Sequence, residues 1–172
     1  MNYLLFYLKY FCIFAVDYMM LELHNVTIGQ QIRGLSATVG EGNVLSITGS
    51  KGSGKTTLLR AVLGFLPVDE GHISIDGELV TPMSAPWFRK QMAYVPQYLV
   101  VPDDYHEVPT NYLSLLKRAV ASGKPLLIVD EPSRTLNAEE MGLVDHLLQD
   151  AVQRGAIVLA VNSRITENKV QL

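Results

Sequence analysis

A glycine-rich stretch in the first third of the chain has the residue types and the spacing that hold a phosphate group. Gly49 is followed, after four residues, by Gly54, Lys55 and Thr56, which satisfies the pattern G-x-x-x-x-G-K-[ST]. Glycines let the backbone curl so that N–H groups point at phosphate oxygens, and a following helix turns its positive end toward them. Lys55 is expected to bridge the β- and γ-phosphates of a nucleotide, and the Thr56 hydroxyl to ligate Mg²⁺. The predicted phosphate-binding residues are Gly49, Ser50, Lys51, Gly52, Ser53, Gly54, Lys55, Thr56 and Thr57.

Two adjacent carboxylates follow an apolar run in "LLIVDEP", residues 126 to 132. If this run is a buried strand, it ends with Asp130 and Glu131 beside the phosphates. Asp130 is then placed to hold Mg²⁺, directly or through water, and Glu131 to orient or deprotonate an attacking water. The alternative is a solvent-exposed Asp-Glu pair at a strand end, which the neighbouring phosphate loop disfavours.

Apolar strands that alternate with helices must position these residues. Strands are expected at 21–28, 34–39, 44–48, 91–97, 125–131 and 156–161, and a hairpin at 71–80. Helices are expected at 55–66, 112–121 and 138–153, the last with a capping box from Asn137 and Glu140. The pattern predicts an α/β fold of the P-loop NTPase class. It has a mostly parallel sheet flanked by helices, and a small N-terminal antiparallel β subdomain.

Size and composition favour one such domain. The chain has 172 residues and a net charge of −3, so it has no basic footprint for nucleic acid. Cys12 is the only cysteine, which excludes a disulfide within the chain and fits a reducing cytosol.

Residues 3–16 are apolar and aromatic but too short to span a bilayer. Residues 1–19 are therefore interpreted as an extension ahead of a native start at Met19 or Met20, with a membrane-surface anchor as the alternative. Residues 20–172 form the predicted domain.

The motifs together resemble an ATP-binding-cassette (ABC) ATPase over roughly residues 20 to 165. "MAYVPQ" matches the segment that ends in the family's Q-loop glutamine, here Gln97, and "ASGKPLLIVDEPSRTLN" matches the Walker B strand and the D-loop. The resemblance implies that the chain binds Mg-ATP and hydrolyses it, with Glu131, Lys55 and Gln97 as catalytic residues. It implies that Thr56, Asp130 and Gln97 hold the metal. The implied partners are a membrane transporter subunit and a second ABC cassette, and the implied location is the cytoplasm, peripheral at the inner face of the cell membrane.

The chain departs from the family at the signature loop, which binds the ATP of the opposite cassette. No L-S-G-G-Q occurs, and residues 106–110, from His106 to Thr110, stand in its place. Pro109 has no N–H to offer a phosphate, and Glu107 brings a negative charge. The segment from Gln97 to Asp130 is also short, so a reduced helical subdomain is expected, and homodimerisation is expected to be weak at best.

Other family positions are changed too. The adenine-stacking aromatic is missing, and its place falls near Gln30. The D-loop aspartate is replaced by Asn137, and the switch histidine by Asn162, which can donate a hydrogen bond but carries no positive charge. Because the sequence ends at Leu172, the closing strands of the family are expected to be truncated.

Two functions remain open on these grounds. The first is an ATP-binding subunit of an ABC-type transporter that turns ATP over. The second is a catalytically impaired regulatory or structural partner of a complete cassette. The intact Glu131 supports the first, and the missing signature loop and switch histidine support the second.

Overall fold

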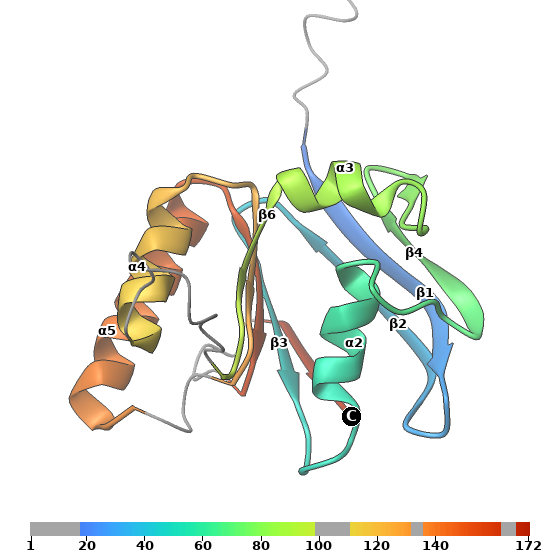
Figure 1. Ribbon diagram of the computed structural model, residues 1–172, viewed down its shortest axis with the longest axis horizontal. Helices are drawn as coiled ribbons and strands as arrows, with labels where there is room; N and C mark the ends of the chain where they lie inside the picture. Colours follow the sequence, from blue (N-terminus) through green and yellow to red (C-terminus); the bar gives the residue numbers. More distant parts are fainter. Residues whose placement is uncertain (1–17, 99–110, 132–135, 163–167) are drawn as a thin grey trace, which may run out of the picture.

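The computed structural model describes residues 18–98, 111–131, 136–162 and 168–172. A four-stranded antiparallel sheet with the order β2-β1-β4-β5 lies on one side of the molecule (Figure 1). Its strands are β1 (Met20–Ile28), β2 (Ile32–Gly40), β4 (Glu70–Ile75) and β5 (Glu78–Leu79). Strand β1 buries Leu21 and Leu23 and, beyond a register shift after Leu23, Val26 and Ile28. This sheet is the predicted N-terminal β subdomain.

A second sheet of five parallel strands carries the predicted site. Its order is β6-β7-β8-β3-β9. The strands are β6 (Met92–Val95), β7 (Leu126–Val129), β8 (Ile157–Val161), β3 (Val44–Thr48) and β9 (Asn168–Gln171). Strands β7 and β8 are apolar throughout and buried on both faces, as expected of a parallel sheet covered by helices. The predicted fold class is confirmed.

Helices cover both faces of the parallel sheet (Figure 1). Helix α2 (Lys55–Val62) lies between the two sheets, and α3 (Ala85–Lys90) crosses above it. Helices α4 (Tyr112–Ala121) and α5 (Ala138–Gln153) pack together on the other face. Alternate residues of β7 accordingly enter different cores: Ile128 packs in the core that includes α2, and Val129 in the core against α4 and α5.

Three differences from the predicted elements have local causes. Helix α2 ends at Val62 rather than at residue 66, because Gly64 turns to a φ of +69° and its N–H bonds back to Ala61 O. Helix α3 was not predicted, because six residues are too few to show a helical period. Strand β9 was not expected either, since "NKVQ" is polar, but it pairs with β3 at the edge of the sheet.

Met19, assigned by the sequence to the extension, is buried at 6% exposure in the core beside β1. Its backbone N–H donates to Glu41 Oε1, and its carbonyl accepts from Glu41 N. The folded unit therefore includes Met19. Among the described residues, no helix is long and apolar enough to cross a membrane.

Candidate functional site

The glycine-rich loop joins the end of β3 to the start of α2. Gly52 and Gly54 have φ angles of +85° and +98°, which side-chain-bearing residues adopt only with strain. A Cβ on Gly54 would also lie 3.1 Å from Ile32 Cγ1, and one on Gly49 would lie 2.4 Å from Ser53 Oγ. The loop geometry therefore needs the glycines that the sequence motif contains.

Lys55, the first residue of α2, is folded back over this loop. Its Nζ donates to Gly49 O at 2.8 Å and to Ser50 O at 2.7 Å, and the residue is only 8% exposed. An ammonium group has three donors, so one remains for a phosphate oxygen. The lysine therefore both fixes the loop and places a positive charge beside it.

Asp130 follows β7 and meets the first turn of α2. Its Oδ2 accepts a hydrogen bond from Thr56 Oγ1 at 3.1 Å. The residue is 2% exposed, and its Oδ1 has no hydrogen-bond partner among the described residues. Burial raises the pKa of the Asp130 carboxyl, and the charge of Glu131 raises it further, while the Thr56 hydroxyl opposes the shift. A hydroxyl beside a buried carboxylate with a spare oxygen is a donor set that fits Mg²⁺.

Glu131 follows β7 and contacts residues that follow the two neighbouring strands, β6 and β8. Its Oε2 accepts from Gln97 Nε2, and its Oε1 accepts from Asn162 Nδ2 at 3.1 Å. Glu131 and Asn162 both lie in the left-handed region, at φ +40° and +50°. Such backbone conformations cost free energy and persist only where the surroundings hold them. The carboxylate is thereby held between two amide groups.

These residues surround a cavity of about 260 Å³ at the carboxyl ends of the parallel strands. Sheets of this type bind ligands at that edge. The cavity is lined by Gln31, Gly49, Lys51, Gly52, Gly54, Lys55, Thr56, Thr57, Gln97 and Glu131. Asp130 does not line the cavity but adjoins it through Thr56, and the lining leaves out Ser50 and Ser53 of the predicted loop. The structure brings the other predicted phosphate, metal and catalytic residues together at this cavity.

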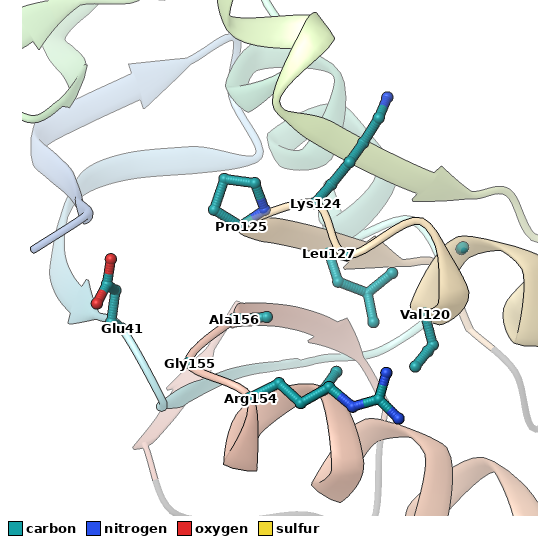
Figure 2. Close-up of a pocket in the computed structure, with 11 residues that line it drawn as sticks. Glu41, Val120, Lys124, Pro125, Leu127, Arg154, Gly155 and Ala156 are labelled. Atoms are coloured by element: carbon teal, nitrogen blue, oxygen red, sulfur yellow. The ribbon is translucent and has the colours of Figure 1, made fainter. Parts of the chain in front are cut away.

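A second cavity, of about 170 Å³, lies near the amino ends of β7 and β8, away from the glycine-rich loop (Figure 2). Its charged side chains already have partners. Lys124 Nζ donates to Met92 O at 2.8 Å, Arg154 forms an ion pair with Asp150 at 2.6 Å, and Glu41 accepts from Met19 N. Each charged side chain that lines this cavity thus has one partner within the protein.

Comparison with known proteins identifies the family. A family model described as ABC transporter matches residues 32–114. The cytochrome c biogenesis ATP-binding export protein CcmA of Bartonella quintana is 30% identical over 163 residues, covering 74% of this chain and 78% of that protein. This chain belongs to the ABC transporter family.

One further relative is matched over a shorter stretch, and two solved structures match most of the chain. ABC transporter B family member 24, a mitochondrial protein of Arabidopsis thaliana, is 35% identical over 89 residues, and the match spans only 13% of its length. Among solved structures, a bacterial Atm1-family ABC exporter with ATP bound superposes with a TM-score of 0.73 at 20% identity. The match covers 92% of this chain and 38% of that one. The ATP-binding subunit of an ABC transporter gives a TM-score of 0.69 at 18% identity, covering 83% and 79%. These structures confirm the fold.

The changed family positions of this chain that fall on described residues have definite places in the structure. Asn162 contacts Glu131, and Asn137 caps α5 with both bonds of a capping box. Gln30 is exposed and outside the cavity, whereas its neighbour Gln31 lines it. The place of the signature loop, His106 to Thr110, lies outside the described residues.

Sequence reasoning missed two contacts at Asp130 and Glu131. Asn162 is singled out by the sequence in place of the switch histidine, but its contact with Glu131 could not be read from the chain order. Tyr112, at the start of α4, donates its hydroxyl to Asp130 O at 3.4 Å and is 5% exposed. Burial, with the charge of Asp130, raises the pKa of the Tyr112 hydroxyl, so this group stays protonated.

Proposed function

We propose that this chain binds Mg-ATP in the cavity at the glycine-rich loop and hydrolyses it to ADP and phosphate. The observation that carries the proposal is the contact between Thr56 and Asp130, which leaves the buried Asp130 Oδ1 unpaired. A buried carboxylate oxygen without a partner is costly, and a bound cation would offset that cost. Magnesium would supply charge neutralisation of the β- and γ-phosphates at this place.

The remaining residues then have separate roles. The backbone N–H groups of the loop and the free donor of Lys55 bind phosphate oxygens. Glu131 orients the attacking water and accepts its proton, while Gln97 and Asn162 hold the two oxygens of its carboxylate. Because Asn162 is a neutral amide, it positions Glu131 without the positive charge that a histidine can supply.

The second candidate, a nucleotide-binding partner with impaired catalysis, keeps one observation in its favour. Both Glu131 oxygens already accept hydrogen bonds, so the attacking water competes with the amides of Gln97 and Asn162. Both candidates share Mg-ATP binding and differ in turnover.

The partner in this proposal is a membrane transporter subunit at the cytoplasmic face. Around α3, four large apolar side chains are exposed: Phe65 at 63%, Leu79 at 50%, Met83 at 93% and Trp87 at 56%. Arg89 lies over the Phe65 ring at 4.7 Å, which ties α3 to the end of α2. Exposed apolar side chains near one helix favour a protein contact there.

Calorimetric titration of Mg-ATP into the full chain tests the binding step. We expect Lys55→Ala to abolish measurable binding, because it removes the charge and two bonds that fix the loop. Lys117→Ala, on the exposed face of α4, is the matched control and should bind like the wild type. Unchanged affinity in Lys55→Ala would overturn the assignment of the site.

A phosphate-release assay then separates the two candidates. Turnover that is lost in Glu131→Gln, with ATP affinity retained, supports hydrolysis by this chain. Wild-type protein that binds Mg-ATP but releases no phosphate supports the impaired partner instead.

A further inference from the structure

Two histidines face each other on the outer side of the antiparallel sheet. His24 on β1 is paired directly with His72 on β4 in the strand register, and both side chains are exposed. Their ring centres are 5.0 Å apart and the ring planes are tilted by 32°. The pair lies on the β subdomain, outside the residues that line the proposed nucleotide cavity.

An irregularity of the backbone fixes this pair in place. The β1–β4 register shifts between His24 and Thr27, where Asn25 has a φ of +49° and Gly71 a φ of +75°. A Cβ on Gly71 would lie only 2.2 Å from His24 O, so the two strands approach closely because residue 71 is glycine. Bulges of this kind re-aim the neighbouring side chains.

The spacing of the rings fits chelation of one metal ion. Two imidazoles that bind one ion at about 2.0–2.1 Å, with ligand–metal–ligand angles of roughly 90–109°, place their ring centres about 4.5–5.2 Å apart. The observed 5.0 Å lies within this interval. A rotation of each ring about its Cβ–Cγ bond turns a nitrogen toward the shared point, and exposed side chains have this freedom.

The surroundings are polar and open to solvent. A depression of about 310 Å³ is lined by Glu22, Leu23, His24, Ser36, Ala37, Thr38 and His72. The Glu22 carboxylate accepts from Ser74 Oγ at 3.2 Å through one oxygen, and it adds negative charge near the pair. In the part of the chain that the structure describes, no three histidine, cysteine or acidic side chains converge on one point. Water must therefore complete the coordination of any ion held here.

We propose that His24 and His72 form a two-histidine site for a divalent first-row transition-metal ion such as Zn²⁺. Imidazole nitrogen is a preferred ligand of these ions, whereas Mg²⁺ and Ca²⁺ prefer oxygen. The bound ion joins β1 to β4 across the bulge and stabilises the β subdomain, because the preformed pair binds it more tightly than the separate histidines of the unfolded chain do.

Calorimetric titration with Zn²⁺ tests the site. The protein is the full chain without nucleotide, in a buffer with Mg²⁺ in excess, and Cys12→Ser removes the only thiol from every variant. Changes in residues that only contact the ligands already weaken metal binding by about 10–100-fold. Losing a direct ligand should therefore lower the affinity for Zn²⁺ at least about tenfold. We expect that loss in His24→Ala and in His72→Ala.

His146→Ala is the matched control, because His146 is a single exposed histidine on α5. It should keep the affinity of the parent protein for Zn²⁺. In histidine side-chain NMR spectra, Zn²⁺ should shift the imidazole signals of His24 and His72 together. Zn²⁺ binding that is absent from the parent protein, or unchanged in either alanine variant of the pair, would overturn the proposal.

Discussion

At the scale of single residues, the buried charge of Asp130 lowers the stability of the folded protein, and the same residue is proposed to hold Mg²⁺. The folded protein holds this carboxyl in a buried place where the charged form is disfavoured, so its pKa lies above that of the unfolded chain. Between those two pKa values the folded state binds more protons than the unfolded state. The stability of the nucleotide-free protein therefore decreases as the pH rises through this interval, and the full cost is present above the folded-state pKa.

Asp130→Asn removes this buried charge and should stabilise the nucleotide-free protein at neutral pH. We expect an increase in melting temperature of roughly 2–4 °C, which corresponds to about 1 kcal/mol for a domain of this size. The same variant should lose Mg²⁺-dependent stabilisation by ATP. Thermal melts at neutral pH, with and without Mg-ATP, measure both effects. A variant that melts below the wild type without nucleotide would show that the hydrogen bond from Thr56 outweighs the cost of burial.

At the scale of secondary-structure elements, the sequence predicted most where local signals were complete. The bounds of α5 agree with the prediction at both ends, because Asn137 and Glu140 form a capping box and Gly155 ends the helix. The end of the strand before Asp130 and Glu131 was also predicted from a local signal, because an apolar run leads directly to these two carboxylates. Strand β9 and the contact between Asn162 and Glu131 were not predictable. Both depend on which strands become neighbours in the sheet.

The cap of α5 gives a test at this scale. Asn137 stands where the family has an aspartate, and here its side chain accepts a hydrogen bond from Glu140 N at 2.9 Å. Asn137→Ala should lower the free energy of unfolding by about 1 kcal/mol, whereas Asn137→Asp should retain the cap and the stability. Urea unfolding followed by far-ultraviolet circular dichroism measures the difference. Equal loss in both variants would mean that the amide nitrogen, and not the capping oxygen, is what stabilises the helix.

At the scale of the whole molecule, the residues of the proposed ATP site lie close together in this chain, whereas the sequence in the place of the signature loop departs from that of the family. The phosphate loop and Glu131 line one cavity, and Asp130 adjoins it through Thr56. In the family, the same ATP is closed over by the signature loop of the opposite cassette. Pro109 at that place lacks a backbone N–H, and Glu107 would bring a negative charge toward the phosphates.

We therefore expect Glu131→Gln, which should hold ATP without turning it over, to remain monomeric in Mg-ATP. Light scattering of the full chain during size-exclusion chromatography measures the mass, and the nucleotide-free protein is the reference. A second copy offers no backbone N–H at Pro109 to the phosphates, and its Glu107 carries a negative charge like theirs. ATP bound to one copy is therefore expected to stabilise a homodimer only weakly. A complete cassette, whose own signature loop carries glycines, could still close over the phosphate loop of this chain. An ATP-dependent dimer of Glu131→Gln alone would contradict this expectation, and would mean that some other segment of the chain reaches the phosphates of its partner.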